Sequence, residues 1–291
     1  MRDFSRDHEW MSINTATLRK QHGKERPLIE ILDDCARYGV RAVAPWRDQV
    51  AAAGLQATSK VIRAHGLALS GYARGGMFTA GDQAGLQLAL DDNRRAVDEA
   101  CELRAACLVL VVGALPGALE GRATHKDIAL SRRQVSDGIA KLLEYARAQQ
   151  MPLAIEPLHP MYAADRACVN TLEQALDICD ALDPQRSGAL GVAVDVYHVW
   201  WDPKLQAQIE RAGRERLLAF HVSDWLTPTT DLLCDRGMMG DGVIDIRQTR
   251  GWVEAGGFAG YSEVEIFSHR WWSLGGDETL RTCIERHRSC V

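Results

Sequence analysis

No hydrophobic run in this sequence approaches the roughly 20 apolar residues that a membrane-spanning helix needs. The first residues mix charges of both signs and contain no apolar core of a secretory signal. Lysine and arginine are not gathered into a basic block, and the net charge is −5, which disfavours a nucleic-acid partner. We therefore expect a cytoplasmic protein that contacts neither membrane nor nucleic acid.

The eight cysteines lack the spacing of a disulfide framework or of a zinc–thiolate site. No Cys-x-x-Cys pair occurs among them. We expect reduced thiols, mostly buried, that pack as small hydrophobic side chains. Phosphate-binding turns are missing too, since Gly71 and Gly75-Gly76 match neither Gly-x-Gly-x-x-Gly nor a Walker sequence. This absence argues against a doubly wound open sheet.

Short apolar runs alternate with segments of helical period along the whole chain. The helical segments include Gln134–Gln149 and Thr171–Leu182, the second with Asn170 as its expected N-cap. Runs without polar alternation are typical of strands buried on both faces. Eight strand-and-helix units predict the α/β class and a single (β/α)8 TIM barrel, in one domain spanning residues 1–291. The expected strands are Trp10–Ile13, Val40–Ala44, Leu67–Tyr72, Cys107–Val112, Pro152–Glu156, Leu190–Asp195, Leu217–Val222 and Tyr261–Phe267.

Four of the later runs end in a side chain that can bind a metal ion. These side chains are Glu156, Asp195, His221 and Glu265. Because the carboxyl ends of parallel strands meet at one rim of a barrel, we expect the four to converge there. Carboxylates and one imidazole, without a thiolate, suit a single divalent ion: Mn²⁺, Mg²⁺, Co²⁺ or Zn²⁺. Glu263 shares a face with Glu265 and should lie one layer deeper. Asp224 is a candidate to orient His221.

Further side chains near the strand ends are candidates for contact with a substrate. His198 lies three residues after Asp195, and His159 lies three residues after Glu156. Tryptophans follow several strands, and indole faces pack well on sugar or cyclitol rings, which makes Trp46 and Trp225 candidates. Asn14 after the first strand and Arg74 after the third are further candidates. The aromatic surface loops leave a homo-oligomer open.

The chain resembles the sugar phosphate isomerase/epimerase family of the xylose isomerase-like barrel superfamily, most of all its inositol-catabolism-related branch. The resemblance covers essentially the whole chain and is carried by Ile-Glu-Pro-Leu-His at 155–159, Asp195 with His198, His-Val-Ser-Asp at 221–224, Arg236 before Gly-Asp-Gly at 240–242, and Glu265. It implies a divalent ion held by Glu156, Asp195, His221 and Glu265. It also implies that the two glutamates act as acid and base and that His198 and Arg236 contact substrate oxygens.

The chemistry expected from this ligand set is proton removal next to a carbonyl group. A metal ion that binds the carbonyl and a neighbouring hydroxyl stabilises the enediolate as it forms. We therefore expect a divalent-metal-dependent isomerase or epimerase acting on a small sugar, cyclitol or keto-polyol. The alternative is a dehydratase or lyase that acts on a keto-cyclitol or keto-sugar through the same metal site. The absence of a clear Lys/Arg cluster favours a free polyol or a keto acid over a phosphorylated substrate.

Two other readings are weaker. A DNA-repair endonuclease of the same superfamily would need histidines at the ends of the second and third strands, which instead end in Ala44-Pro45-Trp46 and in 71–74. A barrel that only binds a sugar, or a subunit completed by a partner, would not need all four candidate ligands.

Overall fold

The computed structural model describes residues 1–291, and nine strands form one nearly closed parallel barrel. The strand order is β5-β4-β1-β13-β10-β9-β8-β7-β6, and every neighbouring pair is parallel. This arrangement confirms the predicted α/β barrel. The strands are β1 (Met11–Asn14), β4 (Ala42–Ala44), β5 (Ala68–Leu69), β6 (Tyr72–Gly76), β7 (Leu108–Val111), β8 (Leu153–Ile155), β9 (Leu190–Asp195), β10 (Leu217–Val222) and β13 (Ser262–Val264).

The third predicted strand is divided in two, and this accounts for nine strands rather than eight. Its first part, β5, pairs with β4, whereas its second part, β6, pairs with β7. The chain thus changes partner at Ser70-Gly71. Isolated bridges between Trp46 and Ala73 and between Leu69 and Ala105 connect the two edges, so the sheet closes on itself.

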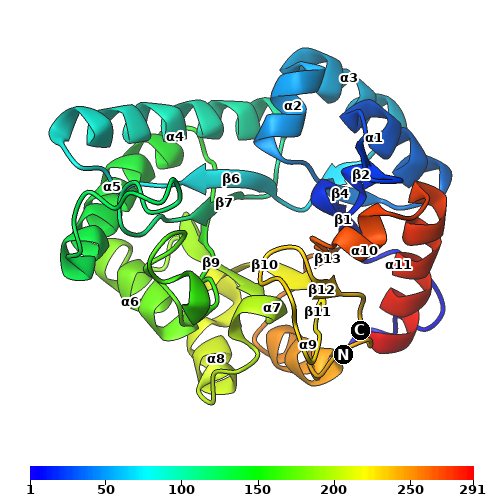
Figure 1. The fold of residues 1–291 in the computed structure, drawn as a ribbon. Helices are drawn as coiled ribbons and strands as arrows, with labels where there is room; N and C mark the ends of the chain where they lie inside the picture. The colour runs from blue at the N-terminus through cyan, green and yellow to red at the C-terminus, as the bar shows by residue number, and fades with distance from the viewer.

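Helices surround the barrel, as the view in Figure 1 shows. Helix α5 begins earlier than predicted because Asp127 accepts a hydrogen bond from the Leu130 amide and caps it. Its buried side chains recur every three or four residues, which places one apolar stripe on the barrel. The helices are α1 (Leu28–Arg37), α2 (Arg47–Ala53), α3 (Leu55–His65), α4 (Gln83–Leu103), α5 (Ile128–Ala148), α6 (Leu172–Leu182), α7 (Val196–Val199), α8 (Leu205–Arg216), α9 (Ile246–Ala255), α10 (His269–Trp272), α11 (Gly276–Cys290) and the 3-10 turns η1 (Thr15–Leu18) and η2 (Pro160–Tyr162).

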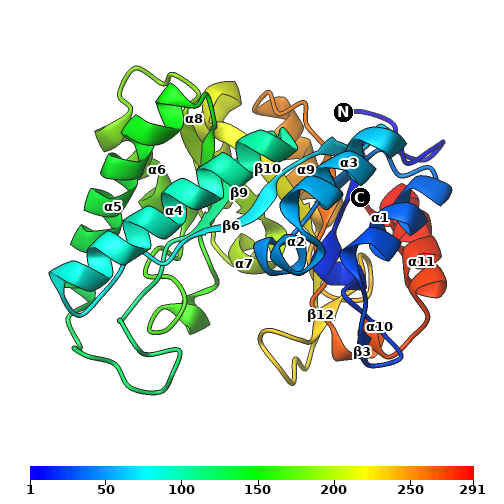
Figure 2. The same ribbon diagram turned by 90° about the horizontal axis from the view of Figure 1, so that it is seen from above.

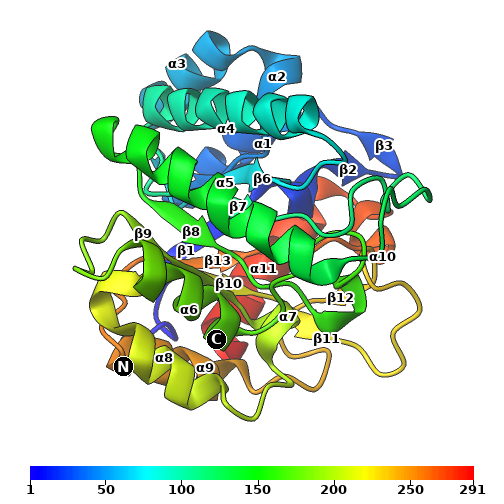
Figure 3. The ribbon, with the colours of Figure 1, turned by 90° about the vertical axis from the view of Figure 1, so that its left-hand side faces the viewer.

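Two short hairpins extend the rim where the strands end. They are β2 (Lys20–Gln21) with β3 (Lys24–Glu25), and β11 (Asp224–Trp225) with β12 (Arg236–Gly237). Figure 2 shows β3, β12, α10 and several long loops on one side of the molecule, and Figure 3 shows β11, β12 and α10 together on that side, away from the N-terminus. The barrel therefore carries its longest connections at the carboxyl ends of its strands.

The two ends of the chain lie close together (Figure 1). The Arg250 guanidinium donates hydrogen bonds to the backbone oxygens of both Arg2 (2.8 Å) and Val291 (3.0 Å). Phe4 stacks on the buried ring of His287. All eight cysteines are free, and five are buried. No helix has both the length and the apolar character needed to cross a membrane.

Candidate metal centre and pocket

Four side chains predicted from the strand ends meet at one point of the rim. Glu156 follows β8, Asp195 ends β9, His221 is the next-to-last residue of β10, and Glu265 follows β13. All four are buried, and each offers one donor atom within 4.8 Å of the donor atoms of the other three. The parallel register sets this convergence, because His221 lies opposite both Asp195 and Glu263 on the strands beside it.

Unpartnered atoms within this group fit a bound cation. His221 Nδ1 lies 2.9 Å from Glu156 Oε1 and 3.7 Å from Glu265 Oε2. Yet neither His221 Nδ1 nor Glu156 Oε1 has a hydrogen-bond partner, although both are buried. Buried polar atoms without partners are costly. A divalent ion about 2.0–2.2 Å from each donor would satisfy them with the nitrogen and oxygen ligands that Zn²⁺ and similar ions accept.

The electrostatics of the group also favour added positive charge. Burial raises the pKa of Glu265 to about 8, with a smaller contribution from the nearby Glu156. Burial alone would lower the pKa of His221, but the charges of Glu263, Glu156 and Glu265 raise it well above its ordinary value. Without a cation, burial thus favours the neutral form of Glu265, and the nearby carboxylates favour the protonated form of His221. A divalent ion would compensate the same negative charge, so the residues present fit such an ion.

Arg236 reaches into the group from β12. Its Nη1 lies 2.9 Å from Asp195 Oδ2 and 3.1 Å from Glu265 Oε2, and its guanidinium lies over the Tyr197 ring. Burial would raise the pKa of Asp195, but Arg236 and His198 outweigh it and keep that pKa below its ordinary value. Arg236 therefore holds Asp195 in its charged form and contacts Glu265 as well.

Asp224 holds the loop that carries Arg236 and does not orient His221 as the sequence suggested. Its two carboxylate oxygens accept hydrogen bonds from the backbone amides of Gly240, Gly242 and Ile244, at 2.9–3.0 Å. The segment that follows Arg236 is thereby fixed against β11.

Glu263 is the residue that lies beneath His221. Its carboxylate accepts hydrogen bonds from the Asn14 side-chain amide (2.8 Å) and the Ser70 hydroxyl (2.7 Å), and it lies 3.6 Å from His221 Nε2. Asn14 also donates to Glu265 (3.0 Å) and accepts from the Trp46 indole (2.7 Å). These hydrogen bonds through Asn14 fix the side chains of Glu265 and Trp46 relative to each other.

A pocket of about 660 Å³, including its open mouth, is lined by two of the four candidate ligands, Glu156 and Glu265. That size is within the roughly 300–1,000 Å³ of small-molecule sites. Four of the predicted substrate contacts line it as well: Trp46, Arg74, His198 and Arg236. Sequence reasoning did not identify Arg166, Tyr162 or Leu233, which also line it; none of the three follows a strand directly.

The other predicted substrate contacts, Asn14, His159 and Trp225, are not among the residues that line this pocket. The donors and acceptor of the Asn14 amide are occupied within the protein, as described above. The His159 ring stacks on Trp225 with centroids 4.6 Å apart. The His159 backbone amide donates to His198 Nδ1 (3.2 Å). Asn14 and His159 thus contact residues that line the pocket, Trp46 and His198, and Trp225 packs on His159.

His198 is a neutral imidazole that faces the pocket. Burial lowers its pKa to about 3, against the opposing effect of Asp195. Both ring nitrogens face donors, because the His159 amide donates to Nδ1 and Arg236 Nη2 lies 3.1 Å from Nε2. A neutral imidazole accepts at only one of its two nitrogens, so these two donors compete for one lone pair. A ligand oxygen at this part of the pocket wall could accept from Arg236 and relieve that competition.

The sequence matches the model of the xylose isomerase-like TIM barrel family over residues 32–290. The chain belongs to this family. An inosose isomerase of Bacillus licheniformis is 24% identical over 199 residues, which span 66% of this chain and 68% of that protein. A second inosose isomerase, from Bacillus velezensis, is 25% identical over 63% of this chain and 62% of its own length.

Two solved structures with the same fold differ in how similar their sequences are to this chain. Protein SMc04130 of Sinorhizobium meliloti 1021 is 57% identical, with a TM-score of 0.90 over 97% of this chain and 98% of that one. The IolI protein, solved with a zinc atom bound, is 18% identical, with a TM-score of 0.77 over 94% of each chain. At that identity the second likeness concerns the fold alone.

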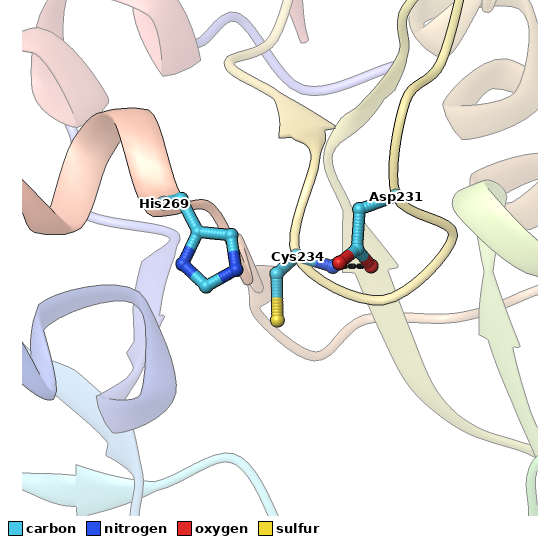
Figure 4. Close-up of side chains that lie close together, drawn as sticks. All are labelled: Asp231, Cys234 and His269. Carbon is cyan, nitrogen blue, oxygen red and sulfur yellow. Dashed lines mark hydrogen bonds between the residues drawn. The ribbon is translucent and has the colours of Figure 1, made fainter.

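This xylose isomerase-like barrel has another group of metal-capable side chains at its rim: Asp231, Cys234 and His269 (Figure 4). Asp231 and His269 are exposed, and one oxygen of Asp231 already accepts the amide protons of Leu233 and Cys234, at 2.8 and 2.9 Å. Burial and the charge of Asp231 raise the pKa of the Cys234 thiol. The first group is therefore the stronger candidate for a metal ion, since its members are buried and two of its donor atoms have no other partner.

Proposed function

We propose that this protein is a divalent-metal-dependent isomerase or epimerase of a small sugar, cyclitol or keto-polyol. The observation that carries the proposal is the convergence of Glu156, Asp195, His221 and Glu265 around one point. Glu156 and Glu265 also line a pocket. The printed name of the curated relatives, inosose isomerase, supports the same class of substrate.

The proposed reaction moves a proton next to a carbonyl group. A divalent ion at the four side chains would polarise the carbonyl and stabilise negative charge on its oxygen. Glu156 and Glu265 both line the pocket, so one would remove the proton and the other would return it to the neighbouring carbon or to the opposite face. Arg236 Nη2 would donate to a substrate oxygen, and His198 beside it would contact the same part of the substrate. The indole of Trp46 would pack against the carbon skeleton.

A positioned acid or base contributes about 10²–10⁴-fold to a rate. Glu156→Gln and Glu265→Gln should each lower turnover at least that much while the fold survives. The test starts with the metal content of the purified protein. It continues with solvent deuterium uptake next to the carbonyl of an inosose or a ketose in D₂O, followed by NMR.

Glu254→Gln is the matched control, because Glu254 is a nearly buried carboxylate that pairs with Arg2 away from the pocket. Deuterium uptake that survives in both pocket variants would remove the two glutamates from the mechanism. Dehydration would begin with the same proton removal, but new ultraviolet absorbance from a conjugated enone would reveal it. Deuterium exchange without new ultraviolet absorbance would identify an isomerase or epimerase.

A further inference from the structure

Two arginines line the pocket without a carboxylate partner. Arg74 extends from β6 and Arg166 from the segment between η2 and α6, and both belong to the pocket lining together with Glu156 and Glu265. Arg166 Nε is buried and has no hydrogen-bond partner. The Arg166 guanidinium lies 5.6 Å from the Tyr162 ring, which is also part of the pocket wall.

The acids near Arg74 are already paired elsewhere. Asp48 lies 2.5 Å from Arg19, and Asp92 lies 2.9 Å from both Arg47 and Arg95. Burial lowers the pKa of Arg74, and the positive charge of Arg166 lowers it further. The two guanidinium groups therefore repel each other, and neither is paired with a carboxylate. Asp231, the acid that feels the charge of Arg166, accepts hydrogen bonds from the Leu233 and Cys234 amides.

The charges at the floor of the pocket do not supply the missing partner. Glu156, Asp195 and Glu265 carry three negative charges, which Arg236 and one divalent ion would balance. Asp195 and Glu265 are also tied directly to Arg236. Arg74 and Arg166 thus remain as two positive side chains that form no ion pair with these acids. Guanidinium groups are the side chains best suited to bind a carboxylate or a phosphate through paired hydrogen bonds.

We propose that the substrate is an anionic sugar or polyol derivative, with a carboxylate or phosphate bound by Arg74 and Arg166 and its carbonyl end at the four-residue centre. This inference rests on the proposed function and narrows its substrate class. It also revises the sequence-based preference for an unphosphorylated substrate, which rested on the absence of a Lys/Arg cluster in the chain. The two arginines are 92 positions apart and are brought together only by the fold.

The test compares three polyols of similar size by calorimetry with Mn²⁺-loaded protein: D-glucitol, D-gluconate and D-glucitol 6-phosphate. At least one anionic polyol should bind about tenfold or more tightly than D-glucitol, since a charge-assisted hydrogen bond contributes at least that much. The tighter of the two anions identifies the group as a carboxylate or a phosphate. Equal affinity for all three would overturn the proposal.

Arg74→Gln and Arg166→Gln should each remove most of this preference and leave the affinity for D-glucitol within about twofold. Arg74→Lys should restore part of it, because the charge remains. Arg133→Gln is the control, since Arg133 is an exposed arginine of α5. A preference that persists in both Gln variants but disappears when the metal is removed would show that the anion binds the ion instead, and would refute the role of the arginines.

These variants also separate this proposal from the proposed function. Arg74→Gln and Arg166→Gln should keep the metal affinity of the unaltered protein, because neither residue belongs to the four-residue group. If the unaltered protein binds no divalent ion, the proposed function fails. If it binds the ion and exchanges deuterium but shows no preference for anions, the substrate inference alone fails.

Discussion

Glu263→Gln should weaken metal binding even though Glu263 is not one of the four candidate ligands. Its carboxylate lies beneath His221, 3.6 Å from Nε2, and is buried with 2% of its surface exposed. Nε2 makes no hydrogen bond at this distance, so Glu263 acts through its charge. That charge favours the imidazole proton on Nε2, which leaves the Nδ1 lone pair directed at Glu156 and the centre. An amide carries no charge and would no longer favour this orientation.

The hydrogen bonds of Glu263 set the size of the effect. The carboxylate accepts from Asn14 at 2.8 Å and from Ser70 at 2.7 Å, and a glutamine can accept at only one of these positions. The lost acceptor costs about 1–3 kcal/mol of folding stability. Loss of a partner that orients a metal-binding histidine typically weakens metal affinity about 10–100-fold, which corresponds to about 1.4–2.7 kcal/mol.

The assay is calorimetric titration of metal-free protein with Mn²⁺ or Zn²⁺, with circular dichroism to verify the fold. Asp183→Asn is the control, because Asp183 is an equally buried carboxylate that pairs with Arg147 and Arg216 far from the rim. The control should lose stability and keep its metal affinity. A folded Glu263→Gln protein with unchanged metal affinity would refute the argument that Glu263 orients His221.

The remaining predictions concern the loop arginine, the second group of metal-capable residues and the chain ends. Arg236→Gln removes a donor from the pocket wall and should raise KM about tenfold in steady-state assays, whereas an unchanged KM would mean that Arg236 only holds Asp195 and Glu265. Replacing Cys234 by Ser together with His269 by Ala should leave the metal content at one ion per chain by plasma emission spectroscopy, and a loss of half the metal would contradict the single-site assignment. Burial lowers the pKa of His287 to about 3, so unfolded chains take up a proton below about pH 6.5 that folded chains refuse. The free energy of unfolding should therefore fall by about 2 kcal/mol more between pH 7 and pH 5 than in His287→Phe, as measured by urea unfolding.

The barrel could be predicted from the sequence because its strands are buried on both faces. Runs such as Leu190–Asp195 consist almost entirely of buried apolar residues, and the structure gives the same bounds for that strand. The division of the third strand could not be predicted, since it depends on which neighbours β5 and β6 pair with. The cap of α6 is Thr171 instead of Asn170, because the Asn170 amide is bonded to the backbone oxygens of Leu158 and Ala167.

The convergence of the four candidate ligands followed from one topological fact, that parallel strands end on the same side. The same rule failed for residues whose side chains the surrounding contacts redirect. Asn14 and His159 also lie near strand ends, but Asn14 is held by Glu263 and Glu265, and the His159 ring stacks on Trp225. Sequence position therefore places a residue near the rim, and its hydrogen-bond partners decide whether it faces the pocket.

Arg74 and Arg166 show that the charge of the substrate could not be predicted from the sequence. Arg166 lies in an irregular segment after η2, with no periodic pattern or motif to mark it, and Arg74 by itself is only one candidate contact after the third predicted strand. Their proposed role as an anion site follows from the fold. The fold places both positive charges in one pocket and pairs the nearby Asp48 and Asp92 with other arginines. Two sheltered positive charges that repel each other reduce stability until an anion binds between them. A substrate that carries such an anion would gain binding energy away from the reacting carbon, and that energy could position its carbonyl end at the candidate metal centre.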